Sequence, residues 1–227
     1  MHVKTPLSTA AVGKRHIVEE KFDKYGFDDH RRRFAAWAAV TAARSSPNCR
    51  FTRDQGVLII ERSGLSKLMA WQDVPIADDS DGTHRELREA VCKAAGCILD
   101  TTPERFTNGV AAKLINVYLK CLFLCGPEPL RDASMQEKAN ALHPPIDRFL
   151  LGNLAVRNVG GRAWFWRKQS RIGWSNFGSE DYQRTIDNIR DVTSGALWTI
   201  EQYWLMPSRS AAGVAQTNPE TGDGIGK

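Results

Sequence analysis

Two charged residues lie against apolar helical patterns, and their side chains suit reaction chemistry. Asp147 precedes Leu150, Leu151 and Leu154 by three, four and seven residues, so its carboxylate lies over the predicted inward-facing side of a helix. An acid held at the lip of an apolar pocket can act as a base or stabilise positive charge. An acid near a helix start also caps free backbone N–H groups, and the spacing leaves both roles open.

A second polar pattern lies in an apolar helix predicted from about residue 109 to 125. Lys113, Asn116 and Lys120 are spaced by three and four residues and therefore share one face. A lysine amine can attack a carbon centre if desolvation or cationic neighbours keep it neutral. The alternative is that this face is simply where the helix meets water.

Helices must position these residues, because apolar residues recur at helical spacing through most of the chain. We predict a mostly α fold that is compact and has one or two lobes. Its helices are expected after Asp28–Asp29 up to Pro47, from Thr83 to a stop at Gly96, over 109–125, from Pro145 onward, over 179–193 and over 197–206. Thr83 and Glu86 resemble a capping box. The run 57–60 is a strand or a helix start.

Aromatic and basic residues alternate between residues 162 and 174. The basic members are Arg162, Arg167, Lys168 and Arg171, and the aromatic members are Trp164, Phe165, Trp166 and Trp174. This pattern is typical of a groove that binds nucleic acid. The alternative is that the tryptophans belong to the hydrophobic core and that the basic residues only face solvent. Tyr203 and Trp204, near the last predicted helix, are expected in the core.

Two segments resemble the core of the helix-hairpin-helix DNA glycosylases, and the 8-oxoguanine branch is the most similar. The segments are GVAAKLINVY at 109–118 and HPPIDRFLL at 143–151. The resemblance implies that Lys113 is the nucleophile and that Asp147 is the catalytic aspartate, whose carboxylate stabilises positive charge on the sugar and can deprotonate a nucleophile. A Lys113 that only binds phosphate would leave an enzyme that releases the base without cutting the strand.

The resemblance also implies a set of binding residues. The expected DNA contacts are Gly109, Lys120, Arg148, Arg167, Lys168 and Arg171. The expected base pocket contains His143, Trp164, Trp166 and Trp174. A turned-out base would be held between such flat side chains. For His143, a structural hydrogen bond that orients the loop is the alternative.

The composition excludes several classes of protein. With 227 residues, 42% hydrophobic and 25% charged, the chain is globular rather than wholly disordered or fibrous. Five cysteines without a CxxC pair argue against a disulfide framework or a structural zinc site. We expect no metal and no cofactor. We also expect no membrane span and no secretory signal, and therefore a cytoplasmic location. Separately, we expect a monomer. Residues 1–13 and 207–227 are expected to be flexible ends of a helical domain over 14–206.

Three functions are compatible with these observations. The first is a DNA glycosylase, with or without strand-cleaving lyase activity, that acts on a damaged base in repair or on modified phage DNA in defence. The second is a non-catalytic nucleic-acid-binding module, which the net charge of +5 permits. The third is a helical domain that binds an acidic protein.

Overall fold

The computed structural model describes residues 25–47, 49–75, 77–100, 102, 105–126 and 132–204. Within these ranges the secondary structure is helical without strands, which confirms the mostly α prediction. The α-helices are α1 (Phe27–Ala43), α2 (Arg53–Arg62), α3 (Ser80–Leu99), α4 (Asn108–Leu119), α5 (Ala133–Ala141), α6 (Arg148–Val156), α7 (Ala163–Ile172) and α8 (Ser179–Thr193). The predicted flexible ends, 1–13 and 207–227, lie outside the described residues.

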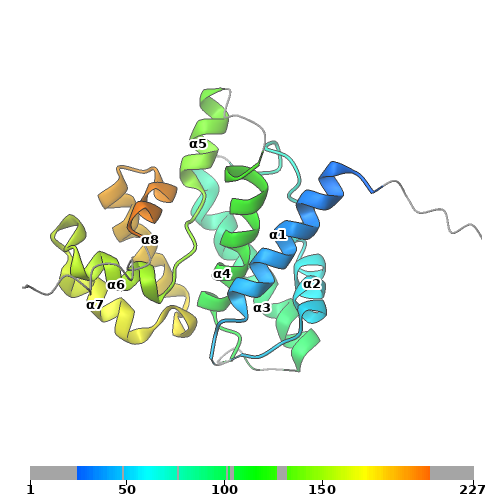
Figure 1. The fold of residues 1–227 in the computed structure, drawn as a ribbon, viewed down its shortest axis with the longest axis horizontal. Coiled ribbons are helices and arrows are strands. Elements are labelled where there is room, and N and C mark those ends of the chain that lie inside the picture. The colour runs from blue at the N-terminus through cyan, green and yellow to red at the C-terminus, as the bar shows by residue number, and fades with distance from the viewer. Residues whose placement is uncertain are drawn as a thin grey trace, which may run out of the picture.

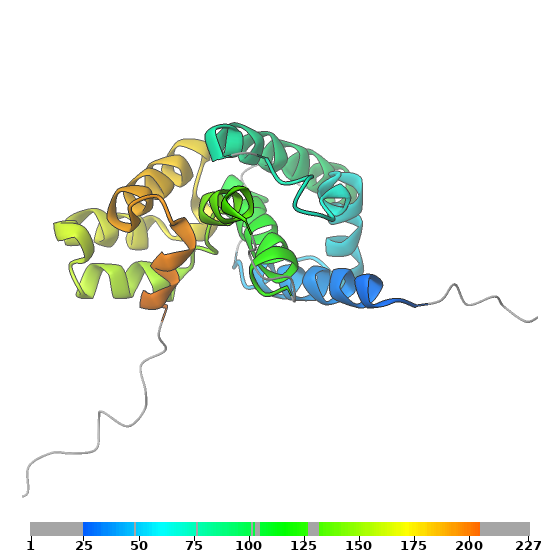
Figure 2. The same ribbon diagram turned by 90° about the horizontal axis from the view of Figure 1, so that it is seen from above.

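The helices form two groups that meet at α4. Helices α1 to α4 lie together on one side, α6 to α8 lie on the other, and α5 stands above the junction (Figure 1). The view from above shows the same separation (Figure 2). Between the α-helices lie short helical segments, of which three concern the site: the π-helix η3 (Lys120–Leu124), and the 3₁₀ helices η5 (Trp174–Asn176) and η6 (Leu197–Tyr203). The other three are η1 (Leu65–Lys67), η2 (Ala77–Asp79) and η4 (Val159–Gly161).

Helix α4 is buried on nearly all sides because both groups pack on it. In the first group α1 packs along α4, and in the second η5 and α8 contact it. Ten of its twelve residues are buried, including Lys113 and Asn116. The polar stripe on this helix therefore does not face water, and that alternative is wrong.

The burial of α1 differs from the predicted stripe. Phe34 and Trp37 are 54% and 47% exposed, whereas Ala35, Ala39 and Ala43 are fully buried. The small side chains fit the close contact between α1 and α4.

Helix α3 differs from the prediction at both ends. It begins at Ser80 and continues to Leu99, so Thr83 and Glu86 lie inside it and form no capping box. Gly96 does not stop the helix. A glycine costs a helix interior only about 1 kcal/mol, and the buried Val91, Ala94 and Ala95 offset that cost.

Two helices were missed and one ambiguity is resolved. Residues 57–60 belong to α2, whose N-cap Thr52 and Gln55 form a capping box. Helices α5 and α7 were not predicted. The aromatic and basic segment that includes α7 was interpreted by composition rather than by period.

Candidate active site

Asp147 is the N-cap of α6. Its Oδ1 accepts hydrogen bonds from the backbone N–H groups of Phe149 and Leu150, at 3.0 and 2.9 Å. The helix therefore begins at Arg148, and the prediction that Pro145 is its first residue is wrong. The expected capping role is confirmed. Because the cap uses Oδ1, the second oxygen of the carboxylate is free for another partner.

That partner is Lys113. Its Nζ lies 3.2 Å from Asp147 Oδ2, although the two residues are 34 positions apart. The side chains are 5% and 14% exposed, so the pair is buried but retains a small accessible surface at the carboxylate. These are the two residues to which the resemblance gives catalytic roles, and we call them the amine–carboxylate pair.

Two tryptophan rings flank the amine. The centroids of the Trp174 and Trp204 rings each lie 5.7 Å from Lys113 Nζ. Asp147 is the only hydrogen-bond acceptor of this amine among the described residues, so a charged amine keeps two of its three N–H groups without an acceptor there. Burial lowers the pKa of Lys113, and the Asp147 carboxylate opposes part of this shift. The lower pKa increases the fraction of neutral, nucleophilic amine.

Gly109 allows Trp174 to approach α4. A Cβ atom at this position would lie 1.8 Å from the Trp174 carbonyl oxygen, which no side chain tolerates. The Gly109 N–H donates to the Phe177 carbonyl oxygen at 3.0 Å. It is therefore not free for the phosphate contact that we expected of Gly109, and the residue acts in packing.

Lys120 is the second amine near this site. It forms an ion pair with Glu201 of η6, and its Nζ lies 5.4 Å from the Trp204 ring centroid. Trp204 thus lies beside both amines and is 43% exposed, so the expectation that it belongs to the core is wrong. Sequence reasoning missed Glu201 and Trp204 because no spacing relates them to Lys113.

A second polar cluster lies on α4, next to the pair. Asn116 Nδ2 donates to the Pro144 carbonyl oxygen at 2.8 Å and to the Tyr182 hydroxyl at 2.9 Å, and its Oδ1 accepts from His84 Nε2 at 2.7 Å. Pro144 belongs to the loop that carries Asp147. Asn116 therefore ties the loop of the carboxylate to the helix of the amine.

The cluster continues through two stacked histidine rings. The ring centroids of His84 and His143 lie 4.1 Å apart. His84 Nδ1 accepts a hydrogen bond from the guanidinium of the buried Arg88 at 2.8 Å. His143 bonds Tyr182 through Nδ1 at 3.0 Å and Asp81 through Nε2 at 2.9 Å. We call these residues, with Asn116, the histidine cluster. Since Arg88 can only donate, His84 is the neutral Nε2–H tautomer.

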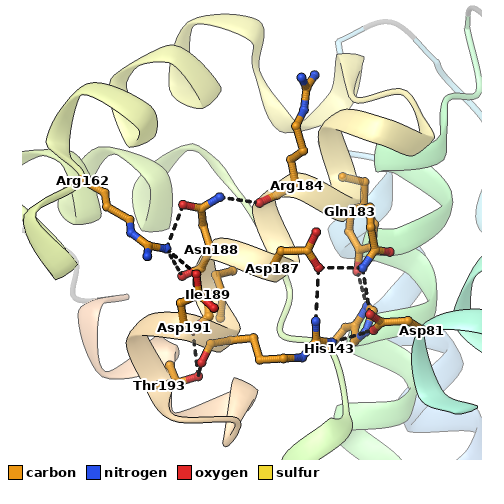
Figure 3. Close-up of polar contacts among 12 residues, drawn as sticks. Asp81, His143, Arg162, Gln183, Arg184, Asp187, Asn188, Ile189, Asp191 and Thr193 are labelled. Atoms are coloured by element: carbon orange, nitrogen blue, oxygen red, sulfur yellow. Dashed lines mark hydrogen bonds and ion pairs between the residues drawn. The ribbon is translucent and has the colours of Figure 1, made fainter. Parts of the chain in front are cut away.

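The cluster reaches the second group of helices through Asp81 (Figure 3). Its carboxylate also binds Arg190 at 2.7 Å and Gln183 at 2.8 Å, both from α8. These contacts, with the hydrogen bond from His143 as the largest effect, hold the pKa of Asp81 well below its usual range. Asp81 thus fastens α8 to α3.

The structure separates the expected base-pocket residues. Both ring nitrogens of His143 are engaged, which confirms the structural hydrogen bond and leaves no ring nitrogen for a substrate. Trp166 is fully buried and donates its indole N–H to Val159, so it is a core residue. Trp164 is 69% exposed on α7. Trp174 is the member that lies beside the amine–carboxylate pair.

Four of the six expected DNA contacts are at the surface. Arg148, Arg167, Lys168 and Arg171 are exposed, and the Arg148 guanidinium lies 4.7 Å from the Phe149 ring centroid.

No protein-family model, curated protein or solved structure matched this chain. Among the described helices, none has the length and apolar character that a membrane crossing requires. The described residues also contain no group of three or more histidine, cysteine or acidic side chains arranged to hold a metal ion.

Proposed function

We propose that this protein is a DNA glycosylase that cleaves the N-glycosidic bond of a damaged or modified base. The observation that carries the proposal is the 3.2 Å contact between Lys113 Nζ and Asp147 Oδ2 in a nearly buried setting. The resemblance of segments 109–118 and 143–151 to the helix-hairpin-helix glycosylases supports the same assignment.

The chemistry requires an amine and a carboxylate at one carbon. Breaking the C1′–N bond builds positive charge on the deoxyribose, which the Asp147 carboxylate would stabilise. Neutral Lys113 Nζ would attack C1′ while the base leaves with the bonding electron pair and takes up a proton. The attacking nitrogen then loses a proton, and ring opening gives the Schiff base that permits strand cleavage.

Burial supports the nucleophilic role of Lys113 over a phosphate contact. The lowered pKa of this amine, caused by burial, favours attack over permanent charge.

Borohydride trapping on a duplex with one abasic site tests Lys113 without knowledge of the base. We expect wild type to form a covalent adduct and Lys113→Gln to form none. Lys138→Gln is the matched control, because its amine bonds the Trp71 carbonyl oxygen, away from the pair. Equal adduct from Lys113→Gln and wild type would contradict the nucleophile assignment.

Base release tests Asp147. The substrates are duplexes with single lesions, 8-oxoguanine first, and genomic DNA of phages with modified bases. Asp147→Asn should reduce release by about 100-fold or more, as expected for loss of a charged catalytic group. Release at the wild-type rate would overturn the proposal.

A non-catalytic nucleic-acid-binding module is the second candidate. The exposed cations of α7 favour it. It predicts salt-sensitive binding, no adduct and no dependence on Asp147.

A further inference from the structure

The outer face of α7 carries three cations and one large aromatic ring. Trp164, Arg167, Lys168 and Arg171 are spaced by three, four and seven residues, so they form one stripe along the helix. All four are exposed, and Trp164 is 69% exposed.

The opposite face fixes the orientation of this stripe. Phe165, Trp166 and Gln169 are buried, and α7 packs along α6. The Trp166 indole N–H donates to the Val159 carbonyl oxygen at 3.0 Å. The helix is thereby held in one register, and its stripe faces outward as a preformed surface.

The three cations have no counter-ion in the part of the chain that the structure describes. Helix α7 contains no aspartate or glutamate. Arg167 and Arg171 are four residues apart, where like charges destabilise a helix. Arg171 lies in the last turn of α7, where a cation favours the helix dipole. This effect does not account for Arg167 and Lys168, and an anionic partner would.

The stripe leads towards the amine–carboxylate pair. Helix α7 ends at Ile172, Gly173 turns the chain at φ +81°, and Trp174 follows beside Lys113. From Trp164 to Arg171 the helix rises about 10 Å. This length corresponds to about three nucleotide steps of 3.4 Å along one DNA strand.

We propose that the outer face of α7 binds the sugar–phosphate backbone of a nucleic acid. Arg167, Lys168 and Arg171 would pair with phosphates, and Trp164 would stack on an unpaired base or a sugar. The charge of the stripe carries the inference, and the choice of nucleic acid over other polyanions rests on the proposed function.

Fluorescence anisotropy with labelled duplex and single-stranded oligonucleotides tests the surface across a salt series. The variant R167Q/K168Q/R171Q should bind the duplex about tenfold more weakly at moderate salt. The slope of log K against log salt should fall by about 2 to 3, as expected for three lost phosphate contacts. Trp164→Ala should weaken single-strand binding by about tenfold.

The matched control is R44Q/R53Q/R62Q, which removes the same charge from exposed positions in the first group of helices. Its slope should stay near that of wild type. Equal effects of the two triple variants would show a general charge effect and overturn the proposal. Thermal melting should show that both variants remain folded.

Two further outcomes separate this surface from the proposed chemistry. In the first outcome, wild type releases the base and the α7 variant binds DNA as tightly as wild type does. This outcome would overturn the α7 surface and leave the proposed chemistry intact. Binding that depends on α7, without base release or adduct, would overturn the glycosylase and leave the surface. Binding to phosphatidylserine vesicles with the same α7 dependence, and none to oligonucleotides, would identify a membrane surface and overturn this proposal.

Discussion

Helix α4 bears two buried polar groups of residues that differ in how completely their hydrogen bonds are satisfied. In the histidine cluster, Asn116 makes three hydrogen bonds, and both nitrogens of His84 and His143 are engaged. In the amine–carboxylate pair, the amine has one acceptor among the described residues and the carboxylate remains 14% exposed. A satisfied cluster stabilises one fold, whereas unused hydrogen-bonding capacity is available to a ligand.

The largest expected contrast is between activity and stability at the pair. The double variant Lys113→Met/Asp147→Asn should abolish adduct formation and change the free energy of unfolding by less than about 1 kcal/mol, or increase it. Uncharged replacement of both members of a buried ion pair is often neutral or stabilising, and asparagine keeps the N-cap of α6. Denaturant unfolding measures this. A loss of several kcal/mol would mean that the pair is mainly structural.

The opposite result is expected in the histidine cluster. Asn116→Ala removes the partners of His84, Pro144 and Tyr182 and should cost about 3 kcal/mol or more, since each unsatisfied buried group costs about 1–3 kcal/mol. Asn140→Ala, on the partly exposed α5, is the control and should change stability by less than about 1 kcal/mol. A stable Asn116→Ala protein would remove the distinction between the two regions.

Acid should weaken the histidine cluster. Burial lowers the pKa of His84 well below 6.5, and burial also lowers that of His143. Below pH 6.5 the unfolded chain binds protons that the folded chain excludes. Stability should therefore fall by up to about 1.4 kcal/mol per pH unit for each histidine. The melting temperature should drop between pH 7 and 5, and an unchanged value would contradict the neutral tautomers.

The smallest effect is expected at Trp204. Removal of its ring takes an aromatic neighbour from Lys113 and Lys120, and a cation–π contact is worth about 0.5–1 kcal/mol at exposed sites. Because this contact stabilises the charged form of the amine, Trp204→Ala should raise the adduct rate by about two- to fivefold, and Trp204→Phe should return it close to the wild-type rate. A complete loss of adduct would mean that the ring contacts the substrate directly.

Local sequence patterns predicted the helices that have a clear apolar period. They failed where packing between the helices determines the start or end of a helix. The cap of α2 is visible in the sequence as Thr52 and Gln55, whereas the continuation of α3 through Gly96 depends on its buried neighbours. Helix α7 was missed because its aromatic residues lie on both the buried and the exposed face.

The two central residues of the candidate site were predictable, and their surroundings were not. Lys113 and Asp147 stand out against apolar helical patterns and lie in the two segments that resemble a glycosylase core. Trp204, Glu201 and Tyr182 come from segments far along the chain, so only the packing of η6 and α8 near α4 brings them to the site.

Gly109 makes the backbones of α4 and η5 touch, with no side chain between them. A library of substitutions at this codon should therefore yield no folded product, even for alanine. Substitutions at position 109 should therefore be found only together with compensating changes in the turn at 173–177, so the two groups of helices would covary at this contact.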